Sequence, residues 1–267
     1  GASFIEWFGE EAKRLYGETI PGHASDKRLI VIKQAIGVCA AITPWNFPSA
    51  MITRKVGPAL AAGCTIVLKP ASQTPFSALA LCELAQEAGI PPGVFSCVTG
   101  SATAIGGELS SNPIVKKLSF TGSTEIGKLL LSQCATTVKK VSMELGGNAP
   151  FIVFDDADIE KAAAGAPGAV FDNAGQDCCA RSRLLIERSA FDKFMPLFEK
   201  AVKAFKCADP FDTSTEMGPL ITKAHKEKVA SYVEESLVAF RGTAPSGTGF
   251  WFPPTVLHIT DRNHKAL

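Results

Sequence analysis

Short apolar segments alternate with helical segments along most of this chain. The strand-like stretches are RLIVIKQAIGVCAAITPW, TIVLKP, GVFSCVTG, VKKLSFTG and KKVSMELGG, and the residues between them predict helices over 75–88, from 102, and over 123–134. Short apolar strands separated by helices are typical of βαβ units, in which the strands pair in parallel. The sequence therefore predicts an α/β protein with a mostly parallel sheet.

A second series of strands and helices begins at PFIVFDDAD. It continues with a helix from residue 159, the strand RLLIER, helices over 190–205 and from 222 to about 237, and the strand GFWFPPTVL. An amphipathic helix is expected over residues 4–16. The pair Gly146-Gly147 between two strand-like segments favours a boundary there. We therefore expect two domains, residues 1–145 and 146–267.

Charge and hydropathy exclude several classes of protein. The formal net charge is +1, so the chain lacks the basic excess of proteins that bind nucleic acid or anionic membranes. The longest apolar stretch, residues 35–42, is far shorter than the ~20 residues of a membrane-spanning helix. The first residues do not resemble a secretory signal. We expect a cytoplasmic protein without nucleic-acid or membrane partners.

Eight cysteines are spread along the chain, and most lie in apolar segments typical of buried free thiols. No C-x-x-C occurs, and no histidine lies at a metal-ligand spacing from a cysteine, so we expect no metal site. The doublet Cys178-Cys179 differs, because it lies in the polar stretch NAGQDCCARSR. A loop thiol can be a nucleophile, although local sequence alone favours an unreactive loop cysteine.

Four other residues are candidates for chemistry. Glu144 follows a strand and is either a general base or a solvated carboxylate. Asn46, in TPWNFP, is either an oxyanion donor or part of a structural turn. Lys69 ends a strand before a proline, and Ser123, in SFTGSTEIG, begins a predicted helix whose N-terminus could bind phosphate. Each signal is ambiguous by itself.

Taken together, PWNFP, LKPASQTP, FTGSTEIG, MELGGNAP and NAGQDC resemble the aldehyde dehydrogenase superfamily, over essentially the whole chain and in the family's order. Residues 3–158 look most like NADP-dependent succinate-semialdehyde dehydrogenases, whereas the part from about residue 165 looks like another, less specialised branch. The resemblance implies a Rossmann-like cofactor domain and an α/β catalytic domain. It also implies that both are incomplete, because a Glu-x-Phe-Gly-Pro motif and other family segments are not found.

The resemblance implies a role for each candidate. Cys178, two positions after Gly-Gln, would be the nucleophile, and Asn46 with the backbone N–H of Cys178 would bind the oxyanion. Glu144 would activate the water that hydrolyses the thioester. The cofactor would be NADP or NAD, and an uncharged Ser72, where NAD-preferring members often carry Glu, would accept NADP. The implied cofactor-binding residues are Ile42, Thr43, Trp45, Lys69, Ser72, Gly122 and Ser123.

The implied substrate is a small aldehyde, with succinic semialdehyde as the first candidate. Arg54 matches one of two arginines that grip the remote carboxylate in those enzymes, but Asp172 occupies the place of the other. Asp177 also adds negative charge beside Cys178. The alternatives are a general small-aldehyde dehydrogenase, a catalytically silent fragment or pseudoenzyme, and a CoA-acylating enzyme, which the presence of Glu144 disfavours.

The segment of about residues 27–38 resembles the strand that pairs subunits in this family, although it also fits an ordinary edge strand. The resemblance therefore implies a homodimer or homotetramer for the complete protein.

Overall fold

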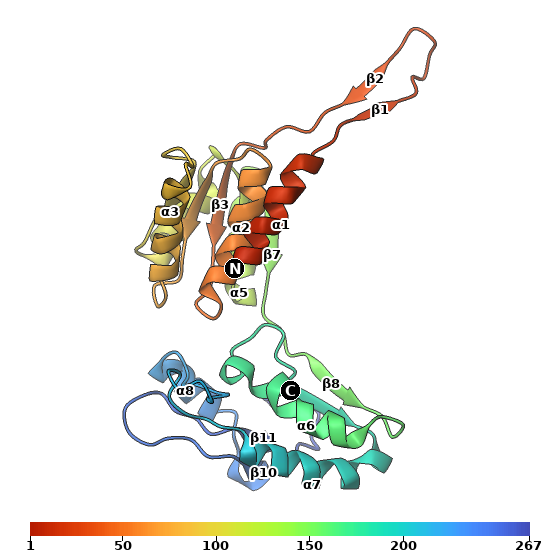
Figure 1. The fold of residues 1–267 in the computed structure, drawn as a ribbon, viewed down its shortest axis with the longest axis vertical. Coiled ribbons are helices and arrows are strands. Elements are labelled where there is room, and N and C mark those ends of the chain that lie inside the picture. Colours follow the sequence, from red (N-terminus) through yellow and green to blue (C-terminus); the bar gives the residue numbers. More distant parts are fainter. The chain divides into compact units, whose positions relative to one another are not determined.

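The computed structural model describes all 267 residues, which form two compact units, Gly1–Gly146 and Gly147–Leu267 (Figure 1). Both units combine helices with parallel strands, so the α/β prediction is confirmed. None of the helices is both long enough and apolar enough to cross a membrane.

The first unit is built on a five-stranded parallel sheet. Its order is β5-β4-β3-β6-β7. The chain runs outward from β3 through β4 to β5, then crosses back to place β6 on the other side of β3. In open α/β sheets, such a reversal leaves a ligand-binding crevice at the carboxyl ends of the two central strands. The strands are β3 (Val38–Ile42), β4 (Ile66–Lys69), β5 (Phe95–Cys97), β6 (Val115–Thr121) and β7 (Lys140–Glu144).

Side chains of β3 alternate between the two faces of this sheet. Cys39 and Ala41 pack in one buried cluster with Ile52 of α2, whereas Ala40 packs in another with Leu109 and Leu130 of α4 and α5. This period of two is what a strand covered on both faces requires. The helices of this unit are α1 (Ala2–Glu11), η1 (Ala12–Arg14), α2 (Pro48–Ala61), α3 (Phe76–Glu87), α4 (Ala102–Ser111) and α5 (Thr124–Ala135).

Helix α2 is absent from the sequence-based expectations. Gly57 and Pro58 lie inside it, and both residue types are weak formers of helix interiors. Pro48 occupies its first turn, where proline is well tolerated. Burial of Met51, Ile52 and Val56 stabilises the helix against the sheet in spite of its composition.

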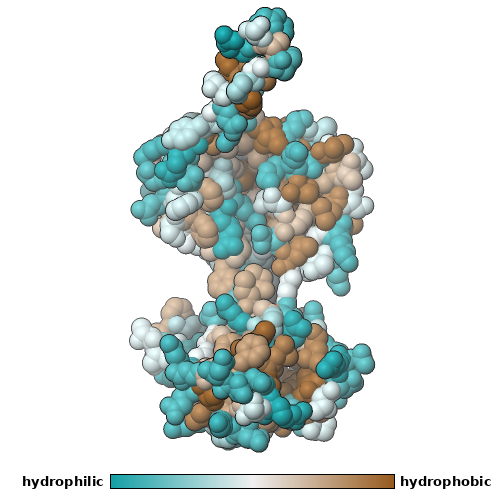
Figure 2. Space-filling view, turned by 90° about the vertical axis from the view of Figure 1, so that its right-hand side faces the viewer, coloured by the Kyte–Doolittle hydropathy of each residue, from teal (hydrophilic) through white to brown (hydrophobic).

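A β-hairpin extends from the first unit (Figure 1). Strands β1 (Glu18–Ile20) and β2 (Leu29–Val31) pair antiparallel, and every residue of both strands is exposed. The expected strand over residues 27–38 is therefore interrupted, because residues 32–37 form no strand between β2 and β3. Figure 2 shows apolar side chains at the surface of the hairpin.

The second unit packs α6 against α7 around a core rich in phenylalanine. Phe194 and Phe198 are fully buried with Ala163, Ala166 and Val170. Its elements are β8 (Pro150–Val153), α6 (Ile159–Phe171), η2 (Asp172–Gly175), β9 (Arg183–Ile186), α7 (Arg188–Ala204), α8 (Lys223–Ala230), η3 (Glu235–Leu237), β10 (Val238–Arg241) and β11 (Thr255–Leu257). Strands β8 and β9 are parallel, and β10 and β11 are antiparallel.

Two predicted elements of the second unit are shorter in the structure than expected. The helix predicted from 222 to about 237 ends at Ala230, and a separate short 3₁₀ helix follows it. The strand predicted over GFWFPPTVL contains only Thr255–Leu257. Pro253 and Pro254 have no backbone N–H to donate to a neighbouring strand, so the ladder begins after them.

Candidate functional site

The carboxyl edge of the five-stranded sheet gathers several of the predicted site residues. Ile42 lies opposite Lys69 on one side and Phe120 on the other, and Thr121 lies opposite Glu144. Backbone bonds extend the pairing past the strands, since the N–H of Thr43 donates to Lys69 O at 3.1 Å. Likewise the N–H of Gly122 donates to Glu144 O at 3.1 Å.

Two hydroxyl groups at this edge are buried without a hydrogen-bond partner. They are Thr43 Oγ1, just after β3, and Thr121 Oγ1, at the end of β6. Buried polar groups in folded proteins nearly always have a hydrogen-bond partner, so two unpartnered hydroxyls at the same sheet edge need an explanation. Both oxygens are covered by protein atoms, so a ligand in this crevice, where dinucleotides bind in open α/β sheets, would reach them only after a local rearrangement.

The turn between β6 and α5 suits close approach of such a ligand. A Cβ on Gly122 would lie 2.4 Å from a ring carbon of Phe120, so a larger residue does not fit without displacing the ring. Ser123 caps α5, and its Oγ accepts the N–H of Ile126 at 3.4 Å. The N-terminus of a helix attracts phosphate through its unpaired N–H groups and its dipole. The cofactor-binding roles of Gly122 and Ser123 stay predictions.

Lys69 and Ser72 follow the neighbouring strand. The Lys69 side chain is buried, and its Nζ donates to Pro70 O at 3.0 Å. Burial lowers the pKa of this lysine. Ser72 is exposed in the turn after β4. Trp45 and Asn46 are half-buried in the connection from β3 to α2.

Lys55 is a functional candidate that the sequence analysis did not single out. It lies on α2 with only 7% of its surface exposed, and its Nζ donates to Ser119 Oγ of β6 at 3.2 Å. Burial lowers its pKa to about 8, although the charge of Glu144 opposes this effect. A lysine three positions after Ile52 and one before Val56 points to the buried face, but this signal is visible only once α2 is recognised as a helix.

Arg54, the predicted substrate-binding residue, lies beside Lys55 on α2. Its guanidinium carbon lies 4.8 Å from the centroid of the Phe4 ring in α1. Its Nε is buried without a hydrogen-bond partner. The side chain is therefore held by a cation–π contact and keeps unused donor capacity.

The loop that carries Cys178 begins with an unusual backbone conformation. Asn173, Ala174 and Gly175 have φ values of 49°, 57° and 72°, three successive left-handed residues directly after α6. Gln176 fixes this loop, because its Nε2 donates to Asn173 O at 3.0 Å and its Oε1 accepts the N–H of Ile221 at 3.0 Å. The Gly-Gln pair before the cysteine thus has a structural role.

Cys178 lies in a turn closed by the N–H of Ala180, which donates to Asp177 O at 3.1 Å. Its thiol is half-buried, donates to Asp177 Oδ1 at 3.6 Å, and lies 3.7 Å from the sulfur of Cys179. Burial raises the pKa of the Cys178 thiol to about 11, with further contributions from Cys179 and Asp177. The thiol is therefore protonated at neutral pH. Gly147 touches this turn, since a Cβ there would lie 2.9 Å from Cys178 O.

The predicted residues thus fall into three groups. Ile42, Thr43, Lys69, Gly122, Ser123 and Glu144 share the carboxyl edge of the first unit's sheet, and Trp45, Asn46 and Arg54 lie in the connection and helix that follow β3. Cys178 and Asp172 belong to the second unit. The meeting of Cys178 with Asn46 and Glu144 stays a prediction, because the three residues come from different units.

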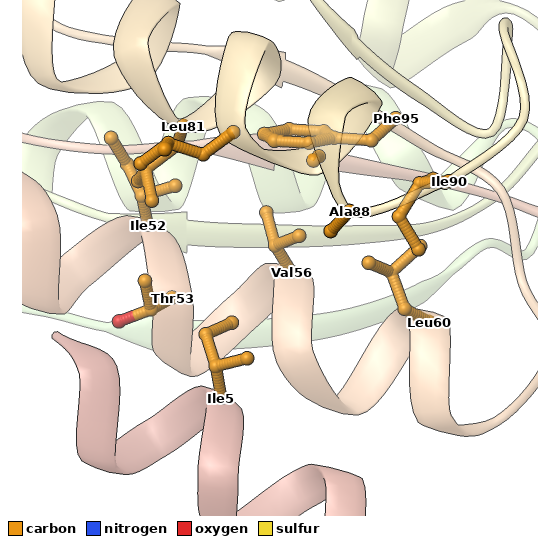
Figure 3. A pocket seen from close by; sticks show the side chains of 11 residues that line it. Ile5, Ile52, Thr53, Val56, Leu60, Leu81, Ala88, Ile90 and Phe95 are labelled. Atoms are coloured by element: carbon orange, nitrogen blue, oxygen red, sulfur yellow. The ribbon is translucent and has the colours of Figure 1, made fainter.

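A cavity elsewhere in the first unit contains none of these residues. It has a volume of about 230 Å³ and is lined by apolar side chains of α1, α2, α3 and the segment leading to β5 (Figure 3). Its walls offer almost no polar groups, so it is unsuited to a charged dinucleotide.

Known proteins are similar to this chain over its whole length. Residues 1–267 match the family model described as "Aldehyde dehydrogenase family". The chain is 60% identical to the NADP(+) succinate-semialdehyde dehydrogenase of Escherichia coli, over 99% of this chain and 56% of that protein. It is 57% identical to a glutarate-semialdehyde dehydrogenase of Pseudomonas aeruginosa, over 98% of this chain and 55% of that protein.

A solved structure is similar over the same extent. The structure of succinate-semialdehyde dehydrogenase from Burkholderia pseudomallei matches with a TM-score of 0.95 and 51% identity, covering 99% of this chain and 56% of that one. The chain therefore spans about half the length of the curated relatives it matches.

Proposed function

Because this chain belongs to the aldehyde dehydrogenase family, we propose that it takes part in the oxidation of a small aldehyde to a carboxylic acid with NADP or NAD. The observation that carries this proposal is the carboxyl edge of the β3–β6 sheet. That edge combines two orphan threonine hydroxyls, a glycine turn, a capped helix N-terminus and Glu144. Dinucleotides bind at edges of this kind in open α/β sheets.

In this proposal the residues of the edge hold the dinucleotide. Lys69 and Ser72 bind the adenosine ribose, Gly122 and Ser123 bind the pyrophosphate, and Ile42, Thr43 and Trp45 line the groove. The nicotinamide, when bound, accepts a hydride from the substrate. Ser72 brings no negative charge to the ribose, so a 2′-phosphate is accepted and NADP can bind. The E. coli relative, named as NADP(+)-dependent, supports this assignment.

Cys178 forms the covalent intermediates. Its thiolate adds to the aldehyde carbon to give a thiohemiacetal, whose oxyanion accepts hydrogen bonds from the Asn46 amide and the Cys178 N–H. Loss of hydride from that carbon leaves a thioester on Cys178. Glu144 then takes a proton from water as the water attacks the thioester, which releases the carboxylic acid and regenerates the thiol.

The substrate class follows from Arg54. Succinate semialdehyde and glutarate semialdehyde, for which the two relatives are named, each carry a carboxylate far from the aldehyde. The Arg54 guanidinium supplies the positive charge that such a carboxylate needs, and its Nε has no hydrogen-bond partner within the protein. Asp172 would repel it, so we propose that this chain also takes small uncharged aldehydes.

The raised pKa of Cys178 favours a second candidate, a domain pair that binds nucleotide without turnover. A thiol with a pKa of about 11 is almost entirely protonated at neutral pH, which slows its attack on an aldehyde. In this alternative the carboxyl edge of the sheet keeps its ligand while Cys178 is silent.

One experiment separates the two functions. The 267-residue chain is mixed with NADP and an aldehyde, and the absorbance of reduced nicotinamide is followed, with tryptophan fluorescence as the measure of nucleotide binding. The first proposal predicts aldehyde-dependent reduction that Cys178→Ala abolishes while nucleotide still binds. Binding without reduction for any aldehyde supports the silent alternative, and failure to bind NADP or NAD contradicts both.

The substrate class is tested by a panel that compares succinic semialdehyde with uncharged aldehydes of similar size. Asp172→Arg should raise kcat/KM for succinic semialdehyde by about tenfold or more, because it replaces a repulsive charge by an attractive one. The uncharged aldehydes serve as the control and should change little. An equal change for both classes would contradict a role for position 172 in recognising the carboxylate.

We also propose that the complete protein is a homodimer or homotetramer paired through the β1–β2 hairpin, whose strands are fully exposed. A reducing compartment such as the cytoplasm is supported by the eight free cysteines of the chain.

A further inference from the structure

Three consecutive residues bring a carboxylate and two sulfur atoms together. The ligand atoms of Asp177, Cys178 and Cys179 all lie within 4.8 Å of one another. The two sulfurs are 3.7 Å apart, and Cys178 Sγ is 3.6 Å from Asp177 Oδ1. A contiguous set of this kind differs from the C-x-x-C and cysteine–histidine spacings of structural zinc sites, whose absence led to the expectation of no metal.

These separations match the edges of a tetrahedral metal site. Zinc bonds to thiolate sulfur are about 2.3 Å long and those to carboxylate oxygen about 2.0–2.2 Å. At the tetrahedral angle, these lengths place two sulfurs about 3.8 Å apart and a sulfur and an oxygen about 3.6 Å apart. Two of the three edges therefore already have the required length, and the third, between Cys179 Sγ and the Asp177 carboxylate, is no longer than 4.8 Å.

We propose that Asp177, Cys178 and Cys179 form a binding site for a single thiophilic divalent cation of the Zn²⁺ class, and that this ion blocks Cys178. A tetrahedral ion held by these three ligands would take a water molecule as its fourth ligand. Cys179 is exposed, so an ion can reach the site directly.

The backbone of the loop orients the three ligands. The N–H of Cys179 donates to Asp177 Oδ1 at 3.1 Å, which directs the carboxylate toward the cysteine side. The turn from Asp177 O to the N–H of Ala180 encloses both cysteines. Because these bonds are local to residues 177–180, the site does not depend on the first unit.

Binding of the ion is coupled to the loss of protons from the two thiols. Both thiols must lose their protons, so each ion bound releases two protons and leaves two thiolates and one carboxylate around a doubly charged cation. The doubly charged cation therefore balances most of the negative charge of its three ligands.

A disulfide is the other product open to two adjacent sulfurs. It would require the sulfurs to approach from 3.7 Å to about 2.05 Å, and it would require an oxidant to accept two electrons. Coordination needs neither, so the geometry favours the metal ion.

The test uses Co²⁺ and Zn²⁺ on the 267-residue chain, kept reduced by a phosphine. Co²⁺ should produce the intense near-ultraviolet absorption of thiolate-to-cobalt charge transfer, saturating at one ion per chain, and Zn²⁺ should displace it. Cys179→Ala should weaken Zn²⁺ binding by about a hundredfold and Asp177→Asn by about tenfold. The first loss is larger because a thiolate is a stronger ligand for Zn²⁺ than a carboxylate. Circular dichroism verifies that the variants are folded.

Cys82→Ala is the matched control, because Cys82 also has a neighbouring thiol, Cys97, but no carboxylate ligand in a shared cluster. It should leave the cobalt spectrum and the zinc affinity unchanged. Unchanged affinity in Cys179→Ala, or an equal loss in Cys82→Ala, would overturn the proposed site.

A second readout, the block of Cys178, rests on the proposed function. Zn²⁺ should slow alkylation of Cys178 and suppress aldehyde oxidation, and a chelator should reverse both effects. With each chain measured against its own rate without Zn²⁺, Cys179→Ala should resist inhibition by Zn²⁺ at least about tenfold better than the parent chain. If no variant oxidises aldehyde, the proposed function fails while the cobalt spectrum still decides the metal site. Equal zinc sensitivity in Cys179→Ala would overturn the block.

Discussion

Cys178 shares its turn with an acidic residue and a second thiol, and both act on its proton. Its Sγ donates to Asp177 Oδ1, and Cys179 lies 3.7 Å away. Burial is the largest cause of the raised pKa, but burial is set by the fold, whereas Asp177 can be changed without altering the core. A single substitution at Asp177 can therefore test what controls the reactivity of Cys178.

Replacing Asp177 by Asn should make Cys178 more reactive. Removal of the negative charge lowers the pKa of the thiol, so more thiolate is present at pH 7.5. Because a less basic thiolate is also a weaker nucleophile, alkylation by iodoacetamide should accelerate about threefold for each unit by which the pKa falls. The rate is followed by mass spectrometry of the Cys178 peptide, with Cys97 as internal reference. A rate that stays the same would show that Asp177 does not control the thiol.

Ser72 provides a residue-scale test of cofactor choice. Ser72→Glu should weaken NADP binding by at least about tenfold, because the new carboxylate repels the 2′-phosphate at close range. Binding of NAD should change little or improve. Titration with each nucleotide, followed by tryptophan fluorescence, gives both affinities. Ser72→Gln is the uncharged control of the same size, and a similar loss in that variant would point to steric exclusion instead of charge.

At the scale of the element, α2 connects the sheet to the proposed substrate site. It carries Arg54 toward Phe4 of α1 and Lys55 toward Ser119 of β6. A buried lysine is costly unless it is partly neutral, which explains the lowered pKa of Lys55. The cost should appear in the pH dependence of stability.

Lys55→Met should remove a stabilisation that develops in alkaline solution. The folded state holds the Lys55 proton less tightly than the unfolded state, so the unfolded chain binds more protons between about pH 8 and about pH 10 and the native chain gains stability over that window. The gain relative to Lys55→Met should be on the order of 2 kcal/mol. Urea unfolding of both chains near pH 7.5 and pH 10 measures it. Parallel curves for the two chains would contradict a lowered pKa.

The β1–β2 hairpin exposes large apolar side chains to solvent, which is unfavourable for a chain that stays monomeric. Ile30 is 72% exposed and Ile32 is 67% exposed, and hairpins of two strands are marginal in water without a packing partner. An exposed apolar edge invites pairing with another chain. The hairpin is therefore a candidate surface for the association of subunits.

Ile30→Lys combined with Ile32→Lys should reduce self-association. If the hairpin pairs subunits, the double variant should shift from dimer or tetramer to monomer in light scattering at the same protein concentration. Its circular dichroism should not change, since neither side chain packs in a buried cluster. Lys33→Ala, on the same segment, is a control that should keep the parent state. Association that survives the double variant would assign it to another surface.

Much of the fold could be predicted because its signals are local. The apolar runs that became β4, β6, β7 and β8 and the helices α3 to α7 lie close to where periodicity and caps indicate them. The elements that were missed or mistaken depend on non-local packing. Helix α2 contains Gly57 and Pro58 yet forms against the sheet, and the helix from residue 222 stops early where no packing face sustains it.

The amino-acid sequence by itself determined the α/β class, the motif set of the aldehyde dehydrogenase family and the candidates for its chemistry, because strand and helix periods and short motifs are properties of neighbouring residues. The tertiary structure decided which of those candidates share an edge. Strand order brought Thr43, Thr121 and Glu144 to the same end of one sheet, burial lowered the pKa of Lys55, and the turn of residues 177–180 set the sulfurs 3.7 Å apart. Some of these properties arise from contacts between residues far apart in the chain, and the others from the conformation of a loop. A local sequence pattern predicts neither kind.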